Sequence, residues 1–208
     1  MFSHVCYNVL MFANNGFSET ALQKQDRALL HKIKDDMPIL CDLCRADLLL
    51  VCRAGDEEGV VVGQWRPHSS SPLYEDSQVG VRVREDTHPQ MLRALQGNVN
   101  PRRVHTVDIK GATVARQMFP VYGSNDETIA VMVKDAYWLA HERHRRRSKA
   151  FQRALLNFIA MVSRGDVRGA GALTPFGEHD GIVYIDAGGS IRYMSGIAAE
   201  LYRHLGYR

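Results

Sequence analysis

Two pairs of side chains in this 208-residue sequence have the spacing of metal ligands. Cys41 and Cys44 form a CxxC motif, but a structural zinc site needs four ligands, and neither a second CxxC nor an HxxxH pair follows. His141 and His144 would share one face of a helix, yet the arginines within 143–147 would repel a cation. The sequence therefore predicts no metal site and favours buried free cysteines, while a redox or metal role for the CxxC pair stays open.

Motifs for a nucleophile or for nucleotide binding do not occur in the sequence. Ser124, Ser163 and Ser195 lack a GxSxG setting, no acidic pair is marked out, and there is no Walker-type loop. We therefore name no catalytic residue and expect a chain that is not an enzyme by itself, although catalytic groups that meet only in space leave no such motif.

Arg66 is the sharpest candidate for binding a ligand through its charge. It follows an apolar run and precedes Pro67, which places it at the end of a predicted strand. A guanidinium group can hold a carboxylate or another anion with two parallel hydrogen bonds. Arg66 can equally pair with Glu75 or Asp76 in the following loop, and the sequence does not decide between these roles.

The run from Arg143 to Lys149 is strongly basic. Such runs bind nucleic acid or anionic membranes, but no base-stacking aromatic residues interleave this one, and the formal net charge of the chain is only +3. We expect a solvated helix face or salt bridges between subunits, and no nucleic-acid partner.

The sequence also bears on the compartment. It has no run of about 18 apolar residues, so we expect no membrane span. Met1 to Phe17 lack the charged start and the cleavage site of a signal peptide, and we expect residues 1–18 to form a disordered or weakly docked leader. These features favour a cytoplasmic protein.

Hydrophobic spacing predicts an α+β domain with a central antiparallel sheet and a helix at each end. The first helix is expected from about Glu19 to Cys44, with a kink or a split at Pro38. The expected strands form two hairpins, 47–53 with 60–66 and 112–122 with 128–134. Between the hairpins we expect a strand at 79–83, a helix at 88–96 and a strand at 102–109.

A second long helix is expected from about Tyr137 to Ser163. Four apolar residues recur along one of its faces: Phe151, Leu155, Phe158 and Val162. At 1.5 Å per residue the helix would be about 40 Å long, more than a small sheet needs as cover. We therefore expect a homodimer in which this stripe packs against its copy.

The end of the sequence resembles the opening of a PAS domain. Residues 164–180 are rich in glycine and form an expected linker. After it, Asp180-Gly-Ile-Val-Tyr-Ile-Asp186, Gly189-Ser-Ile-Arg-Tyr193 and Ala198-Ala-Glu-Leu201 match the hairpin and helix that begin that family. The resemblance implies that 181–208 are the N-terminal part of a PAS domain.

The body of the sequence resembles a GAF-like sensor domain. Val62-Gly-Gln-Trp-Arg-Pro67, the stretch from Leu73 to Gly80, and Gln117-Met-Phe-Pro-Val-Tyr122 leading into Ile129-Ala-Val-Met-Val133 are similar to the N-terminal sensor of one class of bacterial histidine kinases. That class includes a mycobacterial GAF-PAS kinase and the ethanolamine-responsive kinase of gut bacteria. The resemblance covers about 19–163 and implies the fold of that domain.

The GAF resemblance also implies a pocket between the sheet and the short helices on its face. The residues expected to line it are aromatic, apolar or cationic: Trp65, Arg66, Tyr74, Met91, Leu95, Met118 and Phe119. The alternative, which residue type favours, is that these side chains are core, because methionine and aromatic residues are usually buried. The resemblance names no cofactor.

Together the two resemblances imply a signal-sensing regulatory module of a two-component sensor histidine kinase. The stretch His141-Glu-Arg-His-Arg-Arg-Arg-Ser148 lacks the Lys-Asn-Asn sequence of the family's phospho-acceptor helix, and we find no ATP-binding boxes. A response regulator would be contacted only through the kinase domain that this sequence lacks. The alternative is a dimerisation or interaction scaffold without a small ligand, and fold alone does not choose between them.

Overall fold

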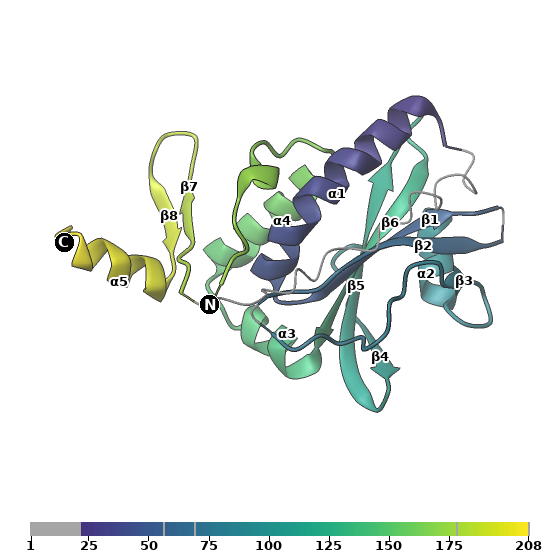
Figure 1. Cartoon of the computed structure of the whole chain (residues 1–208), viewed down its shortest axis with the longest axis horizontal. Coiled ribbons are helices and arrows are strands. Elements are labelled where there is room, and N and C mark those ends of the chain that lie inside the picture. The colour runs from purple at the N-terminus through teal and green to yellow at the C-terminus, as the bar shows by residue number, and fades with distance from the viewer. Residues whose placement is uncertain (1–21, 56, 69, 178, 208) are drawn as a thin grey trace, which may run out of the picture.

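A six-stranded antiparallel sheet forms the centre of the protein in the computed structural model, which describes residues 22–207 except 56, 69 and 178 (Figure 1). The strand order is β3-β2-β1-β6-β5-β4. The predicted leader, residues 1–18, lies outside the described residues. The sheet confirms the predicted α+β fold with an antiparallel sheet.

The two predicted hairpins form the middle of this sheet. β1 (Asp47–Arg53) pairs with β2 (Gly59–Trp65), and β5 (Ala112–Tyr122) pairs with β6 (Thr128–Tyr137). Pairing of β1 with β6 joins the hairpins, and both strands are buried over almost their whole length because both faces of the sheet are covered. The edge strands are short: β3 (Arg82–Val83) and β4 (His105–Ile109).

One face of the sheet is covered by α1 (Lys24–Cys44) and α4 (Lys149–Ser163), which lie side by side (Figure 1). We call it the closed face. Its core includes Leu30, Met37, Leu50 and Met132, none more than 1% exposed. Of the predicted kink or split at Pro38, the split does not occur, because α1 continues through this residue. Proline removes a single backbone donor, and the buried side chains on either side of it hold the helix on the sheet.

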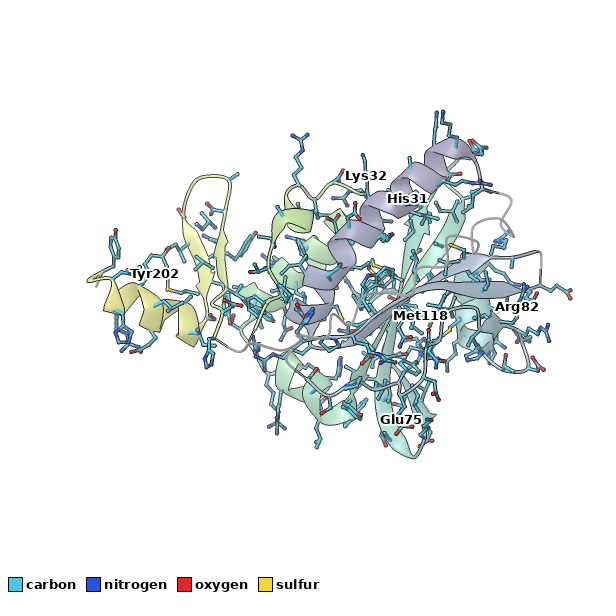
Figure 2. All side chains as sticks on the ribbon, viewed as in Figure 1. His31, Lys32, Glu75, Arg82, Met118 and Tyr202 are labelled. Atoms are coloured by element: carbon cyan, nitrogen blue, oxygen red, sulfur yellow. The ribbon has the colours of Figure 1, made fainter. Side chains whose placement is uncertain are left out.

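The opposite face is covered by α2 (Pro89–Leu95) and by the chain between β2 and α2, residues 66–88 without residue 69 and without β3, which belongs to the sheet. We call this segment the roof and this side of the sheet the roofed face. Tyr74 of the roof and Met91 of α2 pack there over Val61 and Met118 of the sheet. Figure 2 shows Met118 among crowded side chains at the middle of the sheet, whereas Glu75 lies at the periphery.

The predicted helix from 137 to 163 is wrong as a single element. Its first residue closes β6, and the rest forms two helices, α3 (Trp138–Arg145) and α4. The break has a local cause: the Ser148 side chain accepts a hydrogen bond from the Phe151 amide (3.2 Å), which caps a new helix start. Gln152 Nε2 then donates to the carbonyl oxygens of Arg145 (2.5 Å) and Arg147 (3.0 Å), which the break leaves without helical partners.

Beyond α4 and a short 3-10 turn (Ala170–Ala172), the chain forms β7 (Val183–Ile185), β8 (Ile191–Met194) and α5 (Gly196–His204), the hairpin and helix that the sequence predicts. β7 and β8 make a separate two-stranded sheet, which touches the main domain where the rings of Phe151 and Tyr193 lie 5.0 Å apart. α5 carries Tyr202 away from the six-stranded sheet (Figure 2).

Apolar side chains are left open on this C-terminal segment. Ile191, Leu201 and Leu205 are 53%, 49% and 73% exposed. None of the helices formed by the described residues has the length and apolar character needed to cross a membrane.

Candidate functional site

A cavity of about 350 Å³ lies on the roofed face, between the sheet, α2 and the roof. Its volume is near the lower end of small-molecule sites. One part of the wall is apolar and is formed by Leu49, Val61, Val81, Val83, Met91, Val107 and Ile109. The other part is polar and is formed by Tyr74, Gln78, Thr87, His88, Asp108, Lys110 and Arg116. We call it the roofed cavity.

The structure places the seven predicted pocket residues in four different settings. Tyr74 and Met91 line the roofed cavity. Leu95 and Met118 are buried in the same apolar cluster, away from the cavity wall. The other three lie elsewhere: Trp65 and Phe119 in the core of the closed face, and Arg66 at the edge of the roof.

Strand alternation explains why the seven do not come together. Met118 and Phe119 are neighbours on β5, so their side chains must point to opposite faces of the sheet. Trp65 ends β2 after a bulge, where Leu50 pairs with Gly63 but Val51 pairs with Val61. This extra residue shifts the alternation and places Trp65 on the same face as Val62. The opposite directions of Met118 and Phe119 could be predicted from the sequence, whereas the bulge in β2 could not.

A buried triad closes the polar end of the roofed cavity. Arg116 Nε and Nη2 each donate to one oxygen of Asp135 at 2.8 Å, and the Tyr74 hydroxyl donates to Asp135 Oδ2 at 2.5 Å. Arg116 Nη2 also donates to the Tyr74 oxygen at 3.1 Å. Burial, and then the charge of Asp135, raise the pKa of Tyr74, so its hydroxyl keeps its proton. Burial alone would lower the pKa of Arg116, but the hydrogen bonds to Asp135 outweigh this effect, and the pKa of Arg116 is raised.

His88, which lines the roofed cavity, has an unsatisfied polar atom. Its Nδ1 is buried and has no hydrogen-bond partner among the described residues. Burial, followed by the charge of Arg116, lowers the pKa of His88, which favours the neutral ring at pH 7. A buried polar atom without a partner costs free energy, so a ligand atom or a water that pairs with Nδ1 is favoured here.

The outer edge of the roof is held by ion pairs and backbone bonds. Arg66 Nη2 donates to the carbonyl oxygens of Glu75 and Asp76, at 3.2 Å each. It therefore contacts the two residues named as its loop partners, but through their backbone. Lys110 Nζ bonds Glu75 Oε2 at 2.6 Å and connects the β4–β5 turn to the same loop.

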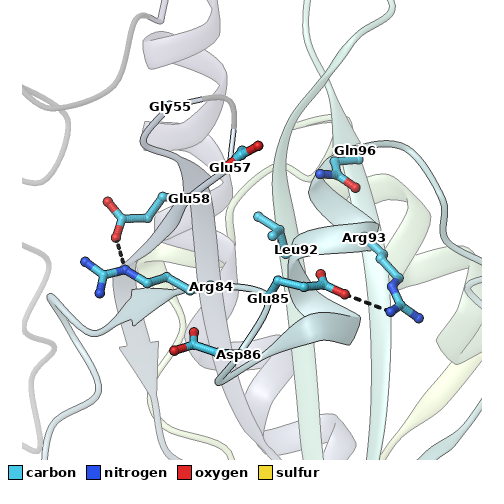
Figure 3. A pocket seen from close by; sticks show the side chains of 9 residues that line it. All are labelled: Gly55, Glu57, Glu58, Arg84, Glu85, Asp86, Leu92, Arg93 and Gln96. Atoms are coloured by element: carbon cyan, nitrogen blue, oxygen red, sulfur yellow. Dashed lines mark hydrogen bonds and ion pairs between the residues drawn. The ribbon is translucent and has the colours of Figure 1, made fainter.

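A larger groove of about 920 Å³ opens beside α2 (Figure 3). Its lining is charged, and the charges pair with one another: Glu58 with Arg84 at 2.5 Å and Glu85 with Arg93 at 2.8 Å. Leu92 is the large apolar side chain in the lining. Because the two arginines of the lining are already paired and the groove is open to water, it offers a ligand less than the roofed cavity does.

Asp42 joins the roof to the segment that follows α4. This carboxylate of α1 is 1% exposed, and it accepts hydrogen bonds from the His68 amide (2.7 Å) and from the Phe176 amide (3.1 Å). The His68 ring nitrogen Nδ1 lies 3.0 Å from Asp42 Oδ2. One side chain thus holds the start of the roof and the glycine-rich linker together.

The predicted dimer stripe contacts its own domain. Phe151 and Val162 are 3% and 0% exposed, and Leu155 and Phe158 pack at the edge of the closed-face core. Leu156 and Met161 point outward from α4 instead and are 44% and 38% exposed.

The three cysteines among the described residues, Cys41, Cys44 and Cys52, lie in the closed-face core. Cys41 Sγ donates to the carbonyl oxygen of Ala46 at 2.9 Å, and burial raises the pKa of Cys44 and brings the pKa of Cys52 to about 12. Thiols with raised pKa values carry little thiolate at pH 7 and react slowly. No group of three His, Cys, Asp or Glu side chains within the described part of the chain is placed to hold a metal ion.

Comparison with known proteins links this geometry to a family. The family model described as the GAF domain of histidine kinase PdtaS matches residues 17–155. A solved structure described as the sensor region of a sensor histidine kinase is 25% identical and has a TM-score of 0.67. The match covers 91% of this chain and 66% of that structure's chain, a little under two thirds of its length.

Weaker likenesses concern transcriptional regulators. The Thermotoga maritima IclR structure is 11% identical with a TM-score of 0.41 and covers 69% of this chain and 68% of its own. An IclR-type regulator from Alicyclobacillus acidocaldarius is also 11% identical, with a TM-score of 0.40, and covers 76% of this chain and 70% of its own. No curated protein matches the sequence.

Proposed function

Since this chain belongs to the family of the GAF domain of histidine kinase PdtaS, we propose that it is the signal-sensing regulatory module of a cytoplasmic two-component sensor histidine kinase. In this proposal the chain itself transfers no phosphoryl group. That chemistry, and contact with a response regulator, belong to a kinase core outside the matched residues. The signal is a small molecule that enters the roofed cavity.

The observation that carries the proposal is the contrast within the wall of this cavity. Apolar side chains from β1, β2, β4 and α2 meet a polar end in which His88 Nδ1 has no partner among the described residues. Arg116 already holds Asp135 with two bonds, so the triad end offers hydrogen bonds without an unpaired cation. A small, mainly apolar molecule with one polar atom fits this arrangement.

The connection through Asp42 supports a route for the signal. The roof covers the cavity, and His68 at its start shares the Asp42 carboxylate with Phe176 of the linker. A ligand that moves the roof would therefore change the hydrogen bonds of Asp42, including its bond to Phe176 of the linker. The linker leads to β7, β8 and α5. Ligand binding should then alter the rate at which a protease cuts within residues 164–180.

The test begins with a thermal-shift screen of neutral metabolites, because a ligand at 100 times its dissociation constant adds about 2.7 kcal/mol of stability. Any ligand found is titrated against His88→Leu, which removes the polar atom, and Met91→Trp, which fills the cavity. Both variants should bind at least about tenfold more weakly. A ligand that binds both variants as it binds the unaltered chain would place the sensing site elsewhere.

We also propose a homodimer through α4. The residues Phe151, Leu155, Phe158 and Val162 pack against their own domain and would support the dimer by positioning the helix, while Leu156 and Met161 face outward to meet a second copy. Sedimentation at micromolar concentration should show a dimer that Leu156→Glu dissociates. Asn157→Glu, at an exposed neighbouring position, is the matched control.

We further propose that residues 181–208 open a PAS domain. The exposed Ile191, Leu201 and Leu205 support this, because one hairpin and one helix bury too little apolar surface to be stable alone. A longer chain with a complete PAS domain should bury them. Unchanged hydrogen exchange across β7 to α5 in that longer chain would contradict the proposal.

A further inference from the structure

A second cavity, of about 260 Å³ and partly open to solvent, lies where α1 ends and β1 begins. Its walls come from parts of the chain that are far apart in sequence: the α1–β1 connection, the roof, the end of β6 and the α3–α4 region. It shares no lining residue with the roofed cavity. The inference below therefore does not depend on the function proposed for the roofed cavity.

The inner wall of this cavity contains a carboxylate that is only half satisfied. Asp47 is 2% exposed, and its Oδ2 accepts a hydrogen bond from the Leu73 amide at 3.0 Å. Its Oδ1 is buried and has no partner among the described residues. A buried carboxylate oxygen in this state favours an N–H donor, and a cationic one most of all.

The rim of the cavity carries the opposite charge. Arg45, Arg143 and Arg147 all line it, and none of the three makes an ion pair within the described part of the chain. Arg147 is held in place by its position over the Phe151 ring, 4.8 Å from the ring centre. Ser70 and Ser71 of the roof add hydroxyl groups on another side.

The backbone conformation of Arg45 also bears on the role of its side chain. Arg45 follows the last residue of α1 with a φ of 49°, a left-handed conformation that glycine or asparagine adopts at much lower cost. Neighbouring Ala46 is buried, and the chain turns sharply here into β1. The arginine at this position carries a conformational cost that glycine would not, a cost that a binding role for its side chain would offset.

The two charges together restrict the ligand. An isolated metal ion is disfavoured by three arginines, and a simple anion is disfavoured by Asp47 on the inner wall. A molecule with a protonated amine and an acidic group satisfies both. Because the three arginines of the rim outnumber the two lining carboxylates, Asp47 and Asp135, of which Asp135 already pairs with Arg116, a ligand with net negative charge is the better complement. The volume is below that of drug-sized sites and suits a molecule the size of an amino acid.

We propose that this cavity binds a small acidic zwitterion of the dicarboxylic amino-acid class. Its amine contacts Asp47 Oδ1 on the inner wall, and its carboxylates contact the guanidinium groups of Arg45, Arg143 and Arg147 at the rim. The roof hydroxyls of Ser70 and Ser71 complete the binding of the carboxylates.

Three probes test this assignment on the full chain by calorimetric titration at low ionic strength. L-glutamate has all the required groups, glutarate lacks the amine, and L-glutamine lacks one negative charge. Glutamate should bind at least about tenfold more tightly than either of the others, since each lost contact involves a charged group. Equal affinity for glutamate and glutarate, or no heat with glutamate up to about 10 mM, would overturn the proposal.

Substitutions separate binding from folding. Asp47→Asn keeps the shape of the side chain but should remove the preference for glutamate over glutarate. Arg45→Gly should weaken glutamate binding about tenfold while leaving the thermal midpoint unchanged or higher, because glycine accepts the left-handed backbone. Arg146→Gln, an exposed arginine that does not line the cavity, is the control and should bind normally. Loss of affinity in Arg146→Gln equal to that in Arg45→Gly would show only a general charge effect and refute the site.

Discussion

The two faces of the central sheet are filled in different ways. The closed face, under α1 and α4, is packed with leucine, methionine, valine and cysteine side chains. The roofed face has an apolar cluster too, but it also contains the Arg116–Asp135–Tyr74 triad, the unpaired Nδ1 of His88 and a cavity. The comparison indicates that the closed face is filled by apolar packing, while the roofed face leaves part of its volume unfilled, which is where we propose a binding site.

Breaking the triad should have the largest effect. Arg116→Met leaves the Asp135 carboxylate buried without its cation, and the free energy of unfolding should fall by about 3–5 kcal/mol in urea titrations. Arg82→Met, which removes a partly exposed arginine paired with Glu58, is the control and should cost less than about 1 kcal/mol. Equal losses would mean that the triad does not differ from a surface pair.

Matched methionine truncations sharpen the comparison of the faces. Met37 on the closed face and Met91 on the roofed face are 0% and 2% exposed, but Met91 also borders the roofed cavity. Met37→Ala should cost about 2–5 kcal/mol, and Met91→Ala less, at roughly 1–2 kcal/mol, because part of its surface has no packing partner to lose. Urea unfolding of both variants gives the two losses in the free energy of unfolding. A larger loss for Met91→Ala than for Met37→Ala would contradict the assignment of the faces.

The pH dependence of stability should reveal the buried carboxylate at the start of β1. Burial, offset in part by the Leu73 amide and by Arg66, raises the pKa of Asp47 to about 6. A raised pKa means that the folded state binds this proton more tightly than the unfolded state. The protonated Asp47 therefore contributes fully to the free energy of unfolding below about pH 4, and this contribution is lost as the pH rises through 6.

Asp47→Asn removes that titration. The stability of the unaltered chain should fall by roughly 2 kcal/mol relative to Asp47→Asn between pH 4 and pH 7, a decrease measured by urea unfolding at a series of pH values. Parallel pH profiles for the two proteins would show that Asp47 titrates normally in the folded state.

The smallest effect is expected in the charged groove beside α2. Glu85→Gln removes the pair with Arg93, in which the two side chains are 57% and 61% exposed, and the change should lie within about 0.5 kcal/mol (Figure 3). Added salt should alter this difference in the free energy of unfolding only slightly. A loss above about 1 kcal/mol would assign this groove a structural role that its exposure does not suggest.

Local patterns in the sequence predicted most of the fold. Both hairpins, the first helix and the C-terminal hairpin and helix lie close to their predicted positions, because each depends on hydrophobic spacing within one segment. The break between α3 and α4 was missed, although Ser148 is a common helix-capping residue, because the apolar stripe that follows suggested a longer helix.

The candidate sites were harder to predict for a physical reason. Tyr74 and Met91 were identified, but His88, Asp47 and Asp42 matter through partners or cavities built from distant segments. Arg116 and Asp135 are 19 positions apart and meet only because β5 and β6 pair in the observed register. No single-segment pattern encodes such contacts.

The triad has a consequence that follows from its position. Arg116 and Tyr74 line the roofed cavity, while Asp135, which holds both of them, lines the cavity beside Arg45. The two cavities therefore share a partition one hydrogen-bonded layer thick. Thermodynamic reciprocity then requires that any shift of this layer by one occupant changes the affinity for the other by the same factor in both directions. If both proposed sites bind their ligands, such a sensor responds to a combination of two concentrations, and whether that factor lies above or below one decides whether the second molecule reinforces or cancels the first.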